Sequence, residues 1–218
     1  MSRVESFKDG TVSGFLHVPD SPTGDGLVLA HGAGGNAQGP VLVSLGEEFA
    51  GLGFHVLRID LPFRQERRGP PRPTDAKKDQ AGIRAAGDSL RARAQGRIFL
   101  GGHSYGGRMS SMLVADDNSV AAGMLLSSYP LHPPGKPDQL RTAHFSKLTL
   151  PVFFAHGTRD PFGTIDEVRK AIALIPGKTE LFVVEGAGHD LKGKRDGLAT
   201  AFLKLVESSE KIHNSAAL

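Results

Sequence analysis

"RIFLGGHSYGGRMSSM", residues Arg97 to Met112, decides the fold of this chain of 218 residues. It begins as an apolar run and continues beyond the glycines with Met109, Met112 and Leu113 at helical spacing. Ser104 therefore lies at a predicted junction of strand and helix. Because the chain has 28 glycines, Gly-x-Ser-x-Gly is expected about 0.3 times by chance, so the argument rests on the position of the pattern.

A serine at such a junction is held in a strained backbone conformation that exposes its hydroxyl. Gly102 and Gly106, two residues before and two after it, lack the Cβ atoms that would clash in this turn. The turn also places the first unpaired N–H groups of the helix beside the hydroxyl. The sequence thus predicts Ser104 as a nucleophile and the Tyr105 N–H as one donor of an oxyanion hole.

The second oxyanion donor has to come from another loop, and "AHGAGGN", residues 30–36, follows a predicted strand. Gly32 and Gly34 suit a bend that lets backbone approach a substrate carbonyl closely. We expect the N–H of Ala33 to be the donor, with Gly34 as the alternative. A phosphate-binding loop is the competing interpretation, but the segment lacks the lysine and hydroxyl of a P-loop and the Gly-x-Gly-x-x-Gly spacing.

A serine hydroxyl attacks an acyl carbonyl only when a base takes its proton and an acid orients that base. His189 follows the last predicted strand in "ELFVVEGAGHDL", and Asp160 follows the preceding strand in "PVFFAHGTRDPFG". They complete the chain order Ser, Asp, His typical of such an elbow architecture. Asp190 adjoins the histidine and is poorly placed to receive its ring proton, and Asp60 is expected to fix a turn or cap a helix.

A metal site is an alternative use of the histidines at the strand ends. His31, His103 and His156 could gather there, but no carboxylate and histidine spacing supports a metal, and we expect none. The chain has no cysteine, which excludes disulfides, thiolate ligands and a cysteine nucleophile.

Short apolar runs alternate with longer segments rich in alanine and charge, which predicts an α/β three-layer sandwich with a mostly parallel central sheet. The strand candidates are GLVLAHG, HVLRIDLP, RIFLGGH, GMLLSSYP, PVFFAHG and ELFVVEG. The helix candidates are residues 40–52, 74–94, 105–115, 164–175 and 195–208. Asp9-Gly10 predicts an antiparallel hairpin before the sheet. We expect one domain over residues 1–210 and a loose tail over 211–218.

Two stretches resist assignment, "FRQERRGPPRPTD" and the proline-rich "YPLHPPGKPDQLRTAHFSK". Loops at the carboxyl ends of parallel strands line the binding crevice. The first loop carries Arg64, Arg67, Arg68 and Arg72, and we hypothesise that Arg67 and Arg68 favour anionic substrates, a solvated loop face being the alternative. Tyr129 and Phe162 are candidates for the acyl pocket or for core packing. The second loop has room for a short flap and not for a full cap.

Composition and charge argue against nucleic acid and membrane as partners. The 26 basic residues are spread against 23 acidic ones, for a net charge of +3, and this balance is not a nucleic-acid footprint. No apolar stretch approaches the roughly 20 residues of a membrane helix, and the N-terminus lacks the apolar core of a secretory signal. We therefore expect a cytoplasmic protein that binds neither nucleic acid nor membrane, with its oligomeric state open.

On these residues the chain resembles the α/β-hydrolases, and among them the small dienelactone-hydrolase-like and testis-expressed-protein-type members without a large cap domain. The resemblance runs from "LAHGAGGN" through "GGHSYGG" and "HGTRDPFG" to "GAGHDL". It implies that Ser104, Asp160 and His189 form the triad and that the amides of Tyr105 and Ala33 form the oxyanion hole. True dienelactone hydrolases carry a cysteine nucleophile, so dienelactone is not inherited as the substrate.

The expected activity is hydrolysis of a carboxylic ester or thioester of a small acyl substrate through an acyl-enzyme, with no cofactor. Two other functions stay open. One is a binding or scaffold protein that keeps the fold without catalysis. The other is an acyltransferase or peptidase that uses the same triad.

Overall fold

The computed structural model describes residues 2–193 and 195–215. Within them, eight strands form one sheet in the order β1-β2-β4-β3-β5-β6-β7-β8. The strands are β1 (Arg3–Asp9), β2 (Val12–Val18), β3 (Gly26–Ala30), β4 (His55–Ile59), β5 (Ile98–His103), β6 (Gly123–Ser127), β7 (Val152–Gly157) and β8 (Thr179–Val184). The predicted hairpin is confirmed: β1 pairs with β2 antiparallel around Asp9 and Val12.

The six strands from β3 to β8 pair with one another only in parallel. On its other side, β4 pairs with β2 antiparallel. A parallel sheet is covered on both faces, so its strands are apolar throughout. All five residues of β3 and of β6 are buried, as are all six of β7. The mostly parallel sheet predicted from the apolar runs is therefore confirmed.

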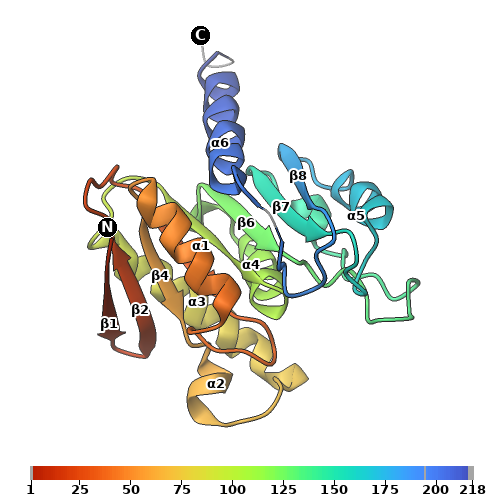
Figure 1. The fold of residues 1–218 in the computed structure, drawn as a ribbon, viewed down its shortest axis with the longest axis horizontal. Helices are drawn as coiled ribbons and strands as arrows, with labels where there is room; N and C mark the ends of the chain where they lie inside the picture. Colours follow the sequence, from red (N-terminus) through yellow and green to blue (C-terminus); the bar gives the residue numbers. More distant parts are fainter. Residues whose placement is uncertain (1, 194, 216–218) are drawn as a thin grey trace.

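Helices cover both faces of the sheet (Figure 1). They are α1 (Pro40–Gly51), α2 (Pro62–Glu66), α3 (Ala76–Arg91), α4 (Tyr105–Asp116), α5 (Ile165–Ile172) and α6 (Leu198–Ser215). On one face, Phe202 of α6 packs edge to face with Phe49 of α1 and with Phe99 of the sheet. On the other face, Ile83 of α3, Met109 of α4 and Val168 of α5 belong to a second core cluster. These layers are the predicted three-layer sandwich.

Two segments differ from the expectation drawn from sequence. The first part of "FRQERRGPPRPTD" forms the short helix α2, which begins at Pro62, where a proline is favoured because its missing N–H has no helical partner. The last helix continues to Ser215, so the tail expected from residue 211 is helical as far as the structure describes it. Neither glycine nor proline interrupts residues 208–215, which explains the continuation. Residues 216–218 of the predicted tail lie outside the described residues.

The carboxyl ends of β3, β5, β7 and β8 meet at one edge of the sheet, and the loops that follow them carry the residues singled out by sequence. Between the strands of the described chain there is no large cap domain. Among the same residues, every helix falls short of the length and apolarity needed to span a bilayer.

Candidate active site

Ser104 occupies a strained turn between β5 and α4. Its φ is 51° and its ψ is −117°, a conformation that a residue with a side chain rarely adopts. The turn needs small neighbours: a Cβ on Gly102 would lie 2.2 Å from the Ala30 carbonyl oxygen, and one on Gly106 would lie 2.3 Å from the same atom. The two glycines therefore let the turn pack closely against β3, with Ser104 at the carboxyl end of β5.

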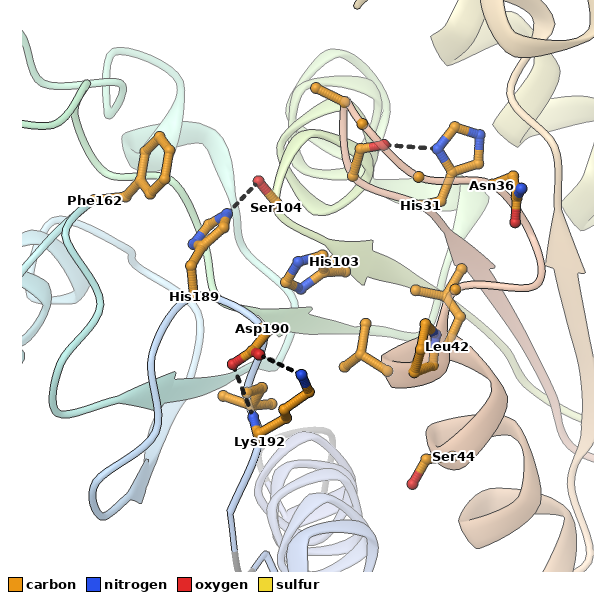
Figure 2. Close-up of a pocket in the computed structure, with 18 of the residues that line it drawn as sticks. His31, Asn36, Leu42, Ser44, His103, Ser104, Phe162, His189, Asp190 and Lys192 are labelled. Atoms are coloured by element: carbon orange, nitrogen blue, oxygen red, sulfur yellow. Dashed lines mark hydrogen bonds and ion pairs between the residues drawn. The ribbon is translucent and has the colours of Figure 1, made fainter.

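The structure brings Ser104, His189 and Asp160 together in one hydrogen-bonded chain. Figure 2 shows the bond between Ser104 and His189. Ser104 Oγ lies 2.8 Å from His189 Nε2, and His189 Nδ1 lies 2.9 Å and 3.0 Å from the two Asp160 carboxylate oxygens. A carboxylate only accepts hydrogen bonds, so Nδ1 carries the ring proton. The Nε2 atom is then free to accept the hydrogen bond that the Ser104 hydroxyl donates.

Neighbouring groups hold Asp160 and His189 in place. The Asp160 side chain is fully buried, and its Oδ1 also accepts a hydrogen bond of 2.9 Å from the Phe162 amide. The Phe162 ring stacks on the His189 ring with centroids 4.2 Å apart. On the other side lies His103, with its ring centroid 5.1 Å from that of His189. Burial and the charge of His189 lower the pKa of His103 to about 4, so His103 stays neutral beside the base.

The loop after β3 approaches the nucleophile closely. A Cβ built on Gly32 would lie 3.4 Å from Ser104 Cβ, whereas one built on Gly34 would have nothing within 4 Å. The Gly32 carbonyl oxygen is held by two donors, His31 Nδ1 at 2.8 Å and the Gly35 amide at 3.0 Å. Because a trans peptide points its N–H opposite to its C=O, the Ala33 N–H faces away from both donors.

His31 is held in the tautomer that donates to the Gly32 carbonyl oxygen. The Leu61 amide donates to its Nε2 over 3.1 Å, so Nδ1 carries the proton that is donated to the Gly32 carbonyl (Figure 2). Burial lowers the pKa of His31 and keeps the ring neutral. In the described chain, neither the Ala33 amide nor the Tyr105 amide, at the first position of α4, has a hydrogen-bond acceptor. Both are free to bind a developing oxyanion.

Arg64 of α2 and Asp79 of α3 contact the two residues that carry these amides. Arg64 of α2 donates from Nη2 to the Ala33 carbonyl oxygen over 2.9 Å, and its guanidinium lies over the Phe63 ring. The buried carboxylate of Asp79 accepts hydrogen bonds from the Phe63 amide, at 3.1 Å, and from the Tyr105 hydroxyl, at 2.7 Å. Burial raises the pKa of Asp79, and these two hydrogen bonds offset part of that rise.

The far end of the same loop is also fixed. Asp60 accepts a hydrogen bond of 2.8 Å from the Ala37 amide, so it holds a turn, as the sequence suggested. Arg58 donates to the Ala37 carbonyl oxygen and to His17 Nε2. Asp190 is exposed and pairs with Lys192 at 3.2 Å instead of contacting the base.

A cavity of about 790 Å³ opens beside Ser104. At one end stand the nucleophile, His189, Phe162 and the loop after β3. The walls continue along the start of α1 with Leu42 and Ser44 (Figure 2). Leu191 and Arg195, on the loop after His189, also line the cavity. Arg195 donates to Ser44 Oγ at that far end.

Three of the four expected substrate contacts lie elsewhere. Tyr129 is 1% exposed and packs on Phe145 and Phe154, so it belongs to the core and does not line the cavity. Arg67 pairs with Asp75 and covers the Phe63 ring, and Arg68 is exposed on the same loop. Neither arginine lines the cavity, because α2 directs the loop behind the oxyanion segment. Phe162 does line it.

Sequence reasoning missed the cavity walls and the Arg64 contact. Leu42 and Ser44 lie on a predicted helix and Arg195 follows His189 in sequence, but only the packing of α1 against α6 shows that they share a cavity. His31 and His156 use ring nitrogens for the carbonyls of Gly32 and Gly163. Among the residues the structure describes, no group of three or more His, Cys, Asp or Glu side chains is arranged to hold a metal.

The sheet order, the elbow at Ser104 and the histidine and carboxylate at the same sheet edge define the class of α/β-hydrolases. The sequence profile of the alpha/beta hydrolase domain family matches residues 24–216, and the chain belongs to this family. The family and the fold place it among the hydrolases as a class.

Solved structures share this fold over nearly the whole chain. A protein of Thermus thermophilus is 22% identical with a TM-score of 0.73, covering 95% of this chain and 98% of its own. A serine hydrolase without lid from Xanthomonas campestris is 17% identical with a TM-score of 0.73, covering 95% and 94%. A dienelactone hydrolase of Anabaena variabilis is 20% identical with a TM-score of 0.68, covering 96% of both chains.

The curated relatives are much longer than this chain. Two Mycobacterium tuberculosis proteins, provisionally named phosphoribosyl transferases, are 28% identical over 184 residues. The alignment covers 82% of this chain and 39% of theirs. The chain therefore spans about two-fifths of the length of these relatives, and the transferase activity in their name is not carried over to it.

Proposed function

We propose that this chain is a serine hydrolase that cleaves a carboxylic ester or thioester of a small acyl substrate. The observation that carries the proposal is the continuous hydrogen-bonded chain from Ser104 Oγ through His189 to the buried Asp160. Each residue has the partner that its role requires: a base on the nucleophile, and an acid on the far ring nitrogen of that base.

In the proposed cycle, His189 takes the proton of Ser104 as the hydroxyl oxygen attacks the acyl carbon. The amides of Tyr105 and Ala33 stabilise the oxyanion, each donor being worth roughly 100-fold to 1000-fold in rate. His189 then protonates the leaving alcohol or thiol, and Asp160 stabilises the imidazolium. A water molecule, deprotonated by His189, attacks the acyl-enzyme, and His189 returns that proton to Ser104 Oγ as the acid leaves. These steps need no metal or organic cofactor.

Water access supports hydrolysis over acyl transfer. The His189 side chain is 24% exposed, and no cap domain covers it in the described chain, so water reaches the base once the leaving group departs. An acyltransferase, or a peptidase with the same triad, remains the second candidate. Adding a competing alcohol to the assay separates hydrolysis from transfer, because a transferase forms the new ester in preference to the acid.

The first experiment is labelling with a fluorophosphonate probe, followed by intact-mass measurement of the wild-type chain and of Ser104→Ala. We expect one rapid label on the wild type and none on the variant. A folded wild-type chain that stays unlabelled would refute the proposal and favour a binding or scaffold protein.

A further inference from the structure

The cavity beside Ser104 extends well beyond the proposed catalytic residues. Its volume of about 790 Å³ falls in the range of roughly 300–1,000 Å³ that holds drug-sized ligands. Figure 2 shows Ser104 at one end and Ser44 at the other, with Leu42 between them. The proposed reaction uses only the end at Ser104, so the rest of the cavity is free to bind the remainder of a substrate.

The middle of the cavity is apolar. Pro40, Val41 and Leu42 of α1 line it, and so does Leu191 on the loop after His189. The two leucines are buried members of one core cluster, so they form a fixed wall. Methylene groups bind well against such a wall, because apolar surface leaves water and no polar group loses its hydration. This part of the cavity therefore suits an aliphatic chain.

A cation lies at the end opposite to Ser104. Arg195 lines the cavity there and is half-buried. Its Nη2 donates to Ser44 Oγ, and because Ser44 lines the cavity too, this bond holds the guanidinium at the cavity wall. The Nε and Nη1 atoms of Arg195 have no acceptor among the described residues, and neither atom is buried. Their N–H groups are therefore free to bind a ligand.

The positive charge of Arg195 is not neutralised in the part of the chain that the structure describes. No carboxylate there lies within ion-pairing distance of it. Asp190 and Lys192 also line the cavity, but they pair with each other at 3.2 Å and add no net charge (Figure 2). Glu48 of α1 instead accepts a hydrogen bond of 2.9 Å from the Ala199 amide. This end of the cavity therefore favours an anionic ligand.

A carboxylate fits this end better than a phosphate does. A guanidinium binds a carboxylate through two parallel hydrogen bonds. A carboxylate carries one negative charge, which matches the single charge of Arg195, whereas a phosphate monoester carries about −1.5 to −2 at neutral pH. The excess negative charge of a phosphate would lose hydration in the cavity without gaining a partner.

We propose that Arg195, held by Ser44, binds a carboxylate at the far end of the acyl chain of the substrate. The preferred substrate is then an ester or thioester of a dicarboxylic acid whose second carboxyl group is free. The inference deepens the proposed function and rests on it. The acyl chain is assigned to the cavity because it stays bonded to Ser104 while the leaving group departs past His189, whose side chain is 24% exposed.

The test compares pairs of 4-nitrophenyl esters with equal carbon number, of which only one carries a free carboxylate. The pairs are pentanoate with hydrogen glutarate, hexanoate with hydrogen adipate, and octanoate with hydrogen suberate. The measured ratio is kcat/KM for the carboxylate ester divided by kcat/KM for the neutral ester. We expect the wild-type ratio to exceed one and to be largest at the chain length that brings the carboxylate to Arg195. A ratio below one at every length would overturn the proposal.

Substitution of Arg195 tests the contact itself. Arg195→Gln removes the charge and should lower the largest ratio about tenfold, through KM and not kcat, because the contact is remote from the reacting atoms. Arg195→Lys should retain part of the ratio. Ser44→Ala should lower the ratio by a smaller factor, because the guanidinium loses the hydroxyl that holds it. Melting temperatures establish that the variants are folded, and a folded Arg195→Gln chain with the wild-type ratio at every length would overturn the proposal.

Two further variants separate Arg195 from the other cations. Arg68→Gln removes an exposed charge outside the cavity and should leave the ratio as in the wild type. Lys192→Gln removes the partner of Asp190 and should lower the ratio less than Arg195→Gln does. If Lys192→Gln alone abolishes the preference, the carboxylate binds at Lys192 and the proposal is wrong.

The proposed function fails differently, through absence of fluorophosphonate labelling at Ser104. If Ser104 is labelled and none of the esters is cleaved, protection from labelling replaces the ratio as the measurement. Monomethyl suberate should then slow the labelling of the wild type more than methyl octanoate does, and Arg195→Gln should remove the difference. Equal protection of the wild type by the two compounds would overturn the assignment of Arg195 and leave the nucleophile in place.

Discussion

Replacing Arg64 with alanine removes the hydrogen bond of 2.9 Å that its Nη2 donates to the Ala33 carbonyl oxygen. That carbonyl belongs to the peptide next to the one whose N–H we propose as an oxyanion donor. Without the contact, the Ala33 to Gly34 peptide can rotate, and the Ala33 amide loses the support that aims it at the acyl oxygen. The proposed triad is untouched, because Arg64 contacts none of its three members.

The magnitude follows from the bond and from the donor it supports. A hydrogen bond from a charged donor contributes about 1.5–3 kcal/mol. Complete loss of one oxyanion donor costs about 2.7–4 kcal/mol in transition-state stabilisation, which sets the upper limit. With about 1.4 kcal/mol for each tenfold change in rate, we expect Arg64→Ala to lower kcat about 10- to 100-fold. KM should change little, because the ground-state carbonyl needs the amide less than the oxyanion does.

The assay is steady-state hydrolysis of a 4-nitrophenyl ester, with the rate of fluorophosphonate labelling as a second measure of the same donors. Arg68→Ala is the matched control, an exposed arginine on the same loop, and it should behave as the wild type. Arg64→Lys keeps a cation and should recover part of the rate. Wild-type kcat in a folded Arg64→Ala chain would refute the reasoning, and so would a defect confined to KM.

Three further predictions follow from the elbow, the base and a buried histidine. Gly106→Ala should destabilise the chain by about 3 kcal/mol or more in chemical denaturation, since its Cβ would lie 2.3 Å from a backbone oxygen of β3, whereas Gly51→Ala, with nothing within 4 Å, should not. Phe162→Ala should slow ester cleavage and leave a folded chain, because it removes the ring that stacks on the base; an unchanged kcat would contradict this. Burial and Arg58 lower the pKa of His17 from 6.5 to about 4, so the unfolded state binds that proton more readily. The free energy of unfolding should fall as pH drops from 6.5 toward 4, and His17 should contribute about 1.4 kcal/mol per pH unit to that slope beside the other buried histidines. His17→Gln should remove this contribution, and an identical slope in the variant would exclude it.

The sequence allows Ser104, Asp160 and His189 to be placed together before any coordinates are known. Each follows an apolar run that predicts a parallel strand, and parallel strands present their carboxyl ends at one edge. The elbow adds the strand-to-helix junction and its two glycines. Local sequence patterns therefore suffice to predict which residues lie together where the direction of the parallel strands determines their positions.

Contacts between side chains of distant segments could not be predicted in this way. Arg64 and Arg67 are alike in sequence, yet one holds the Ala33 carbonyl and the other pairs with Asp75, because Arg64 lies within α2 and Arg67 follows its end in an extended conformation. Tyr129 follows a strand end as the site residues do, but its ring points into the core between Phe145 and Phe154. The cavity walls depend on how α1 packs, which no periodicity encodes.

The carboxylate of Asp79 gives both halves of the proposed oxyanion hole a common foundation. One of its oxygens holds the Phe63 amide, next to Arg64, and the other holds the Tyr105 hydroxyl. The Asp79 carboxylate on α3 thereby fixes the relative positions of two segments that are far apart in sequence. A substrate does not have to displace it. Acylation should begin without a lag on mixing. Mutations in the cavity walls can change the substrate while the groups that stabilise the transition state stay as they are.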